Sequence, residues 1–177
     1  MTFMRSSNRL FPIFVFLTLV SINSQSQNLS KEFPIILQEN SLDCGPVCLQ
    51  MIAEWYDEKC TIEELSEWAK LDSTGTSLWG LSVASDSLDF ETIAVKIPFH
   101  FFVDAAPLPA IIHWNGNHFV VVYKADWNRV WVADPAYGKR IYSKEEFLKY
   151  WLRNQKSDKE AGIVLLLTKK EPPTAKN

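Results

Sequence analysis

The sequence predicts an α+β domain in which N-terminal helices pack on an antiparallel sheet. Helix signals come first along the chain, and short β-rich segments separated by turn residues follow in the second half. Helices and strands that are segregated along the chain in this way are typical of the α+β class. About 150 residues remain once the N-terminus is set aside, which is enough for one substantial core.

The first expected helix begins at Cys44. Asp43 is a good N-cap residue, and Pro46 falls in the first turn, where its missing N–H costs nothing. The apolar residues that follow at helical spacing are Val47, Met51, Ile52 and Trp55. They form one continuous face, so we expect this helix to be held firmly against the core.

Two more helices are expected before the first strand. Thr61 and Glu64 form a capping-box pattern that leads into a helix through Ala69. The segment from Ser77 to Leu88 reads as another helix. Glu63, Glu64 and Glu67 are expected to form a solvated helix face.

The second half of the chain reads mainly as strands. A strong turn dipeptide, Asn115-Gly116, joins two of them into a hairpin, and a helix opened by Ser143 with Glu146 precedes the last one. The region around His100 is expected to be a loop between elements. The expected strands are 91–97, 109–114, 117–123, 129–133, 140–142 and 162–168.

Cys44 lies where a helix start favours an anion. The first backbone N–H groups of a helix have no partner, and the positive end of the helix dipole lies there. A thiolate is an anion, so we expect the pKa of Cys44 to be lowered. A buried structural cysteine is the alternative for a lone cysteine, and the residues considered next favour a nucleophile.

Candidates for a base and for its orienting group lie in the second half. His118 opens a strand beside the turn, and Asp134 ends the next strand, immediately before Pro135. Both side chains can therefore lie at the same edge of one sheet, where the carboxylate accepts from one imidazole nitrogen while the other faces Cys44. Gln38 carries a side-chain amide with two donors just ahead of the cysteine, and we expect it to stabilise an oxyanion.

These residues resemble a known family, the C39 peptidases, which remove double-glycine leaders from bacteriocin and related precursors. The similarity covers roughly Phe33 to Thr168. It is carried by Gln38, Asp43-Cys44-Gly45, Met51-Ile52, His113-Trp114, His118 to Val122 and Asp134-Pro135-Ala136, with weaker similarity over 75–82 and 90–96. The resemblance implies a papain-like fold. It also implies that Gln38 is the oxyanion donor, Cys44 the nucleophile, His118 the base and Asp134 its orienter.

The resemblance implies a cysteine endopeptidase that cuts a peptide precursor after a Gly-Gly pair. A narrow channel beside the thiol, admitting only glycine, would be its physical counterpart. Two alternatives are open: a papain-like amidase or hydrolase that acts on another exported peptide, such as a cell-wall peptide, and a non-catalytic domain that binds leader peptides. The joint presence of Cys44, His118, Asp134 and Gln38 argues against the second.

The expected partner of this chain is a peptide precursor with a double-glycine leader. In well-known members of the family the peptidase precedes a membrane-spanning region and an ATPase, and this chain has no phosphate-binding Gly-rich motif. We therefore expect no ATP binding here, and any ABC exporter is expected to be a separate protein. The net charge of −3 without a basic stripe argues against nucleic-acid binding. No CxxC pair and no His cluster is present, so we expect no metal and no cofactor.

The N-terminus predicts export. Arg5 and Arg9 precede an apolar run of about 13 residues, shorter than the roughly 20 that cross a bilayer as a helix, and Ser24-Gln25-Ser26 offers a cleavage site. We assign residues 1–26 to a signal peptide or N-terminal anchor, 33–168 to the peptidase domain and 169–177 to a polar tail. The domain is expected to be periplasmic or extracellular, or membrane-anchored if the segment is retained.

The remaining candidates are expected to be structural. His113 lies within an apolar strand and is expected to pack or to form a substrate wall. The tryptophans Trp79, Trp114 and Trp127 are expected in the core before they are expected in a cleft. A disulfide between Cys48 and Cys60 is possible but not indicated by their spacing, while Cys44 must stay reduced to act.

Overall fold

The computed structural model describes residues 31–153 and 161–171 of the 177-residue chain, within a compact unit that begins at Glu32. The predicted signal or anchor, residues 1–26, and the end of the predicted tail, 172–177, lie outside the described residues. The helices are α1 (Cys44–Trp55), α2 (Ile62–Trp68), α3 (Leu78–Asp86), α4 (Phe99–Ala105) and α5 (Lys144–Trp151). The strands are β1 (Phe90–Pro98), β2 (Ala110–Trp114), β3 (His118–Ala125), β4 (Arg129–Asp134), β5 (Gly138–Ser143) and β6 (Ala161–Lys169).

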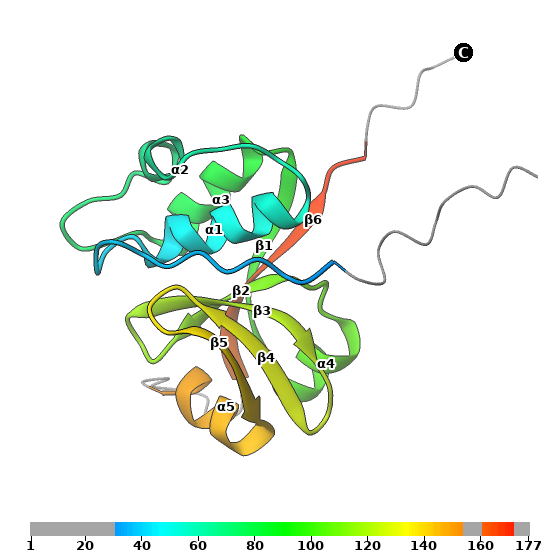
Figure 1. The fold of residues 1–177 in the computed structure, drawn as a ribbon. Helices are drawn as coiled ribbons and strands as arrows, with labels where there is room; N and C mark the ends of the chain where they lie inside the picture. The colour runs from blue at the N-terminus through cyan, green and yellow to red at the C-terminus, as the bar shows by residue number, and fades with distance from the viewer. Residues whose placement is uncertain (1–30, 154–160, 172–177) are drawn as a thin grey trace, which may run out of the picture. The chain divides into compact units, whose positions relative to one another are not determined.

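The strands form one antiparallel sheet of six strands in the order β1-β6-β2-β3-β4-β5. Strands β2 to β5 follow one another as neighbours, whereas the last strand of the chain lies between β1 and β2 (Figure 1). Three helices precede all of these strands. The predicted α+β class, with N-terminal helices packed on an antiparallel sheet, is confirmed.

The sheet separates two hydrophobic cores. Helices α1, α2 and α3 cover one face, and α4 and α5 lie against the other (Figure 1). Alternate residues of each central strand enter opposite cores, as the period of two requires. In β3, for example, Phe119 and Val121 belong to the core under α1, whereas Val120 and Val122 belong to the core over α5. Burial on both faces explains the unbroken apolar run in this strand.

Local signals account for the starts of two helices and for one hairpin turn. Both predicted capping boxes are present: Thr61 with Glu64 at the start of α2, and Ser143 with Glu146 at the start of α5. Asn115 and Gly116 have φ values of 53° and 86°, the two positive values that a type I′ hairpin turn needs.

The turn sets the register in which Trp114 faces His118 across the hairpin. The position of His118 at the start of its strand is thus determined by the three-residue connection 115–117. Helix α1 begins at Cys44 as predicted, with Asp43 in the N-cap position.

The expectation of a loop around His100 is wrong, because this residue lies in α4. Phe99 and Phe102 of this short helix are buried in the core over α5, while His100 is exposed. The segment carries no side-chain N-cap, and Pro98 precedes it with an extended backbone. Tertiary burial of two aromatic rings, rather than a local helix signal, therefore holds this helix in place.

Candidate active site

Cys44 is the first residue of α1, and its side chain is buried in the core under the helices. Asp43 makes no side-chain cap bond; its carboxylate accepts instead from the Asn40 amide, with Nδ2 and Oδ2 2.8 Å apart. The prediction of Asp43 as N-cap is therefore confirmed for its position, but its side chain does not cap. The Val47 N–H bonds the Asp43 carbonyl and Pro46 has no N–H, so among the described residues the N–H groups of Cys44 and Gly45 are the ones left for an anion or a developing oxyanion.

The thiol end of this helix is closely packed. A Cβ atom placed on Gly45 would lie 3.2 Å from Leu81 Cδ2 and 3.2 Å from Thr76 Cβ. Helix α3 and the loop before it therefore pack directly against the start of α1. This contact fixes the position of the α1 start, and so of Cys44, because a residue larger than glycine at position 45 would push α1 and α3 apart.

His118 and Asp134 meet at one end of the sheet, as their places on neighbouring strands predict. Their side chains are joined by a hydrogen bond of 2.9 Å between His118 Nε2 and Asp134 Oδ1. The same carboxylate oxygen accepts from the backbone N–H of Ala136 at 2.8 Å, and Asp134 is buried. The turn after β4 thus holds the carboxylate, and the carboxylate holds the imidazole ring.

The Cys44 side chain is the third group of the site, because its interaction with His118 helps to raise the pKa of the imidazole. Nε2 is occupied by Asp134, so Nδ1 is the ring nitrogen left for the thiol. Burial disfavours the charged imidazole, but hydrogen bonds and charge interactions with Asp134 and Cys44 outweigh burial and raise the pKa of His118 to about 9. The structure therefore favours a protonated His118 imidazole near neutral pH.

Gln38 lies beside the imidazole, at the end of an extended segment. Its backbone N–H donates to the Pro135 carbonyl at 2.8 Å, which ties this segment to the residue after Asp134. Its side-chain Nε2 donates to the Asn40 carbonyl at 2.8 Å, and its Oε1 is buried without a hydrogen-bond partner. One amide hydrogen is thus already used within the loop, and the second is available to a substrate oxygen.

A cavity of about 230 Å³ opens at the surface beside Gln38 and His118. It is lined by Gln38, Ser41, Asn115, Asn117, His118, Ala136 and Tyr137. Gln38 and His118 therefore face the same cavity, from the segment before α1 and from the start of β3. The role of Gln38 as oxyanion donor stays a prediction.

Sequence reasoning did not single out Asn40 or Tyr137. Asn40 bonds both to the Gln38 side chain, through its carbonyl, and to Asp43, through its amide. Tyr137 lies in the turn between β4 and β5, is 70% exposed and lines the cavity beside His118. Their closeness in sequence to Gln38 and Asp134 was the available signal, since short loops next to a site usually line it.

The other histidine and cysteine candidates lie outside this arrangement. His113 packs its ring 5.5 Å from that of Phe119, and burial lowers the pKa of the imidazole. Cys48 and Cys60 are both free thiols, so the disulfide considered from their spacing is not formed. Burial raises the pKa of Cys48 well above its usual range and, together with Glu64 and Glu58, raises that of Cys60 to about 11.

The expectation that the tryptophans belong to the core holds for one of the three. Trp114 is buried against α5, but Trp79 is 63% exposed and Trp127 is 49% exposed. The exposed Trp79 indole makes a cation–π contact instead: the Lys70 ammonium lies 5.1 Å from its ring centroid. The three glutamates of α2 are exposed, as predicted.

No group of three or more His, Cys, Asp or Glu side chains in residues 31–153 and 161–171 lies close enough together to hold a metal ion. In the same residues, no helix combines the length and apolar character that a membrane span requires.

Comparison with known proteins assigns the chain to a family. Residues 32–160 match the model of the peptidase C39 family, and the chain belongs to that family. It is a family of cysteine peptidases that act on double-glycine leaders. The geometry of Cys44, His118 and Asp134 described above is the arrangement that such chemistry requires.

Individual relatives include processing and transport ATP-binding proteins. The chain is 37% identical over 122 residues to the lactococcin-G-processing and transport ATP-binding protein LagD of Lactococcus lactis subsp. lactis, covering 66% of this chain and 17% of that protein. It is 29% identical over 130 residues to the colicin V secretion/processing ATP-binding protein CvaB of Escherichia coli, covering 73% and 18%. The chain thus spans under a fifth of the length of these relatives.

Solved structures agree with the fold. The peptidase domain of Streptococcus ComA, a bifunctional ABC transporter of a quorum-sensing pathway, superposes with a TM-score of 0.68 at 26% identity, covering 78% of this chain and all of that one. A double glycine motif protease from an AMS/PCAT transporter, solved in complex with the leader peptide, gives a TM-score of 0.68 at 25% identity, covering 77% and 91%.

Proposed function

We propose that this chain is a cysteine endopeptidase that removes leader peptides from small peptide precursors after a Gly-Gly pair. The observation that carries the proposal is the His118 imidazole, which bonds Asp134 through Nε2 and whose pKa is also raised by the Cys44 thiol. A nucleophile, a base and an orienting carboxylate in contact form the minimal apparatus of acyl transfer. Membership of the C39 family supplies the substrate class.

The first half of the proposed reaction forms an acyl-enzyme. Cys44 Sγ, as thiolate, attacks the carbonyl carbon of the second glycine, and its electron pair forms a C–S bond while the carbonyl oxygen becomes an oxyanion. The Gln38 side-chain amide and the free N–H groups at the start of α1 stabilise that oxyanion. The imidazolium of His118 then donates its proton to the leaving amine nitrogen, the C–N bond breaks, and the mature peptide departs.

The second half returns the enzyme to its starting state. The neutral imidazole of His118 takes a proton from a water molecule, and the resulting hydroxide attacks the thioester carbonyl. The C–S bond breaks, Cys44 leaves as a thiolate, and the leader is released with a free carboxylate at its second glycine. Asp134 keeps the ring in one orientation in both halves, because its oxygen is itself held by the Ala136 N–H.

Support for the Gly-Gly preference comes from the relatives. One solved structure with the same fold is described as a double glycine motif protease in complex with its leader peptide. Glycine has no Cβ, so a channel that admits only a bare backbone beside the thiol discriminates against every other residue by steric exclusion.

The test is cleavage of synthetic precursor peptides by the full chain under reducing conditions, read by mass spectrometry. We expect one cut, after the second glycine, and its loss in the Cys44→Ala variant. Cys60→Ala is the matched control, because Cys60 is also a free thiol but lies beyond the end of α1. This control should cleave at the rate of the unmodified chain.

The same experiment separates the rival functions. An amidase of cell-wall peptides would leave the Gly-Gly precursors intact and act on peptidoglycan fragments, again through Cys44. A binding domain would retain leader peptides with the same affinity in the Cys44→Ala variant and hydrolyse nothing. Hydrolysis at bulky residues while Gly-Gly peptides stay uncut would contradict the proposal.

A further inference from the structure

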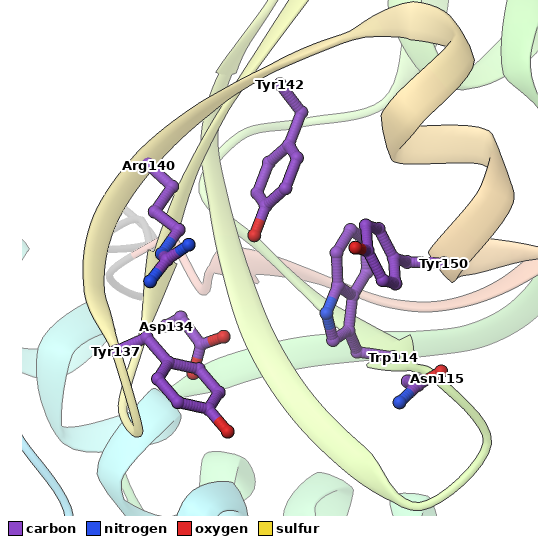
Figure 2. A pocket seen from close by; sticks show the side chains of 7 residues that line it. All are labelled: Trp114, Asn115, Asp134, Tyr137, Arg140, Tyr142 and Tyr150. Carbon is purple, nitrogen blue, oxygen red and sulfur yellow. The ribbon is translucent and has the colours of Figure 1, made fainter.

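A second cavity lies next to the one that contains His118. Its volume is about 300 Å³, and it lies between the β4–β5 hairpin, the end of β2 and helix α5 (Figure 2). It shares Asn115 and Tyr137 with the first cavity, so the two are neighbours along the same surface. Its lining residues are Trp114, Asn115, Asp134, Tyr137, Arg140, Tyr142 and Tyr150.

One wall of this cavity is a packed aromatic cluster. Trp114 stacks on Tyr150 with ring centroids 5.2 Å apart, and Tyr142 lies 5.5 Å from the Trp114 ring and 5.9 Å from that of Tyr150. Figure 2 shows the Tyr142 hydroxyl directed into the space between this cluster and the hairpin. The rings are held by one another, so the wall is preformed and presents hydroxyl donors to a ligand.

Beside Tyr142, strand β5 also carries a positive charge that faces this cavity. The Arg140 guanidinium lies 5.4 Å from the Tyr137 ring centroid and, within the part of the chain that the structure describes, makes no ion pair. Asp134 is the acidic residue of this lining, and its Oδ1 is already engaged by His118 Nε2 and by the Ala136 N–H. At the rim, Arg153 Nη1 bonds Asn115 Oδ1 at 2.8 Å and adds a second cation.

The direction of the substrate follows from the proposed chemistry. His118 must reach the leaving amine nitrogen to protonate it, so the chain beyond the cleaved bond departs over the imidazole. From His118 the surface continues past Asn115 and Tyr137, the two residues shared by both cavities. An extended chain advances by about 3.3–3.6 Å per residue, so the first few residues after the bond come within reach of Arg140.

We propose that this second cavity binds an acidic side chain of the substrate, located in the first few residues after the cleaved bond. The Arg140 guanidinium receives the carboxylate in charge-assisted hydrogen bonds, and the tyrosine hydroxyls complete its coordination. Two sites then determine specificity for the precursor. The site at the thiol selects the glycine pair before the cleaved bond, and the second cavity selects an aspartate or glutamate after it. The inference rests on the proposed peptidase function, because that function sets the direction of the bound chain.

The experiment compares peptides that differ at one residue. Gly-Gly precursors carrying Glu, Gln or Lys at each of the first few positions after the bond are cleaved by the full chain, and kcat/KM is measured. At one of these positions we expect the Glu peptide to be preferred about tenfold over the Gln peptide. Arg140→Gln should bring the Glu-to-Gln ratio to about one, and Arg140→Glu should invert it in favour of Lys.

The matched control is Arg129→Gln. Arg129 is an exposed arginine on the neighbouring strand β4, paired with Asp126 and outside the cavity. The Glu-to-Gln ratio should be the same in this variant as in the unmodified chain. A ratio that changes equally in both variants would indicate a general charge effect and overturn the assignment to Arg140.

Binding separates failure of the inference from failure of the proposed function. The same peptides, labelled for fluorescence anisotropy, are titrated into the Cys44→Ala variant, with and without Arg140→Gln. Tighter binding of the Glu peptide that depends on Arg140 supports the cavity even when no peptide is cut. If cleavage occurs but neither kcat/KM nor affinity distinguishes Glu from Gln, the acidic-residue site is wrong and the peptidase proposal stands.

Discussion

At the scale of single residues, His118 lies between two groups that favour its charged form. Asp134 accepts a hydrogen bond from Nε2, and the interaction with Cys44 also raises the pKa of the ring. The raised pKa of His118, about 9, is the result of these contacts overcoming the effect of burial. The consequence is a proton held on the ring at neutral pH, ready for a leaving amine.

This charge state predicts the pH dependence of catalysis. We expect kcat/KM for a Gly-Gly peptide to fall as the pH rises through about 9, because His118 then loses the proton that the leaving group needs. In Asp134→Asn the hydrogen bond and charge that raise the pKa are weakened, so the alkaline limb should move to lower pH. Profiles of kcat/KM against pH measure the shift, and NMR titration of the His118 ring checks it without turnover.

Asp126→Asn is the control for that prediction. Asp126 is an exposed carboxylate at the β3–β4 turn, and it accepts from the backbone N–H groups of Asn128 and Arg129. Its removal should leave the alkaline limb in place. An Asp134→Asn profile with the same limb as the unmodified chain would contradict the role given to Asp134.

The same raised pKa links protonation of His118 to stability. A group with a higher pKa in the folded state binds its proton more tightly there than in the unfolded chain. The stabilising contribution of His118 is therefore fully present below about pH 6.5, its ordinary pKa, and is lost as the pH rises through about 9. The chain should unfold more easily at the alkaline end of this window.

At the scale of elements, the site depends on how closely α1, α2 and α3 approach one another. Gly80 in α3 faces the end of α2, where an added Cβ atom would lie 2.1 Å from the Ala69 carbonyl oxygen. That oxygen belongs to the backbone and cannot rotate away. The glycine is thus required by a close approach of two helices.

Gly80→Ala is therefore expected to destabilise the protein, although alanine favours an isolated helix by up to about 1 kcal/mol. The clash must be relieved by separating α3 from α2, which we expect to cost about 1–3 kcal/mol. Urea denaturation measures the change in the free energy of unfolding. Ser87→Ala, an exposed change at the C-cap of the same helix, should stay within about 0.5 kcal/mol. Equal stability of the two variants would mean that the helices separate without cost.

The elements also show which local signals could be read without a structure. The capping boxes of Thr61 and Ser143 and the Asn115-Gly116 turn placed two helices and a hairpin correctly, because each acts within four residues. Helix α4 was missed because it has no side-chain cap and is held by the burial of Phe99 and Phe102. A helix of this kind cannot be predicted from a local sequence pattern, because the core residues that bury it lie elsewhere in the chain.

At the scale of the whole molecule, one sheet separates two hydrophobic cores, and each core supports a different part of the proposed substrate site. The core under α1 to α3 positions Cys44, and the core against α4 and α5 supports the aromatic wall of the second cavity. Trp151 joins α5 to β6, since its indole N–H donates to the Ile163 carbonyl at 3.0 Å. A Cβ atom on Gly162 would collide with the same indole.

Neighbouring phenylalanines of α4 test the importance of the second core. Phe102 is 1% exposed and packs against Phe147 and Trp151, whereas Phe101 is 57% exposed. Phe102→Ala should lower the free energy of unfolding by about 3–5 kcal/mol, through lost burial and the cavity left behind. Phe101→Ala should change it by about 0.5 kcal/mol or less. Calorimetry or urea denaturation of both variants checks the difference, and equal losses would contradict this division of α4.

The sequence by itself determined the class of the fold, most of its elements and the three residues that meet at the candidate site. Cys44 at a helix start, His118 after a turn and Asp134 before a proline are all marked by short-range rules. Only the tertiary structure decided that β6 inserts between β1 and β2, that Asp43 bonds Asn40 instead of capping α1, and that Arg140 faces an aromatic cavity beside Asp134. These features depend on contacts between residues that are distant in the chain or compete for one partner, and the balance among such contacts is settled by packing rather than by local pattern.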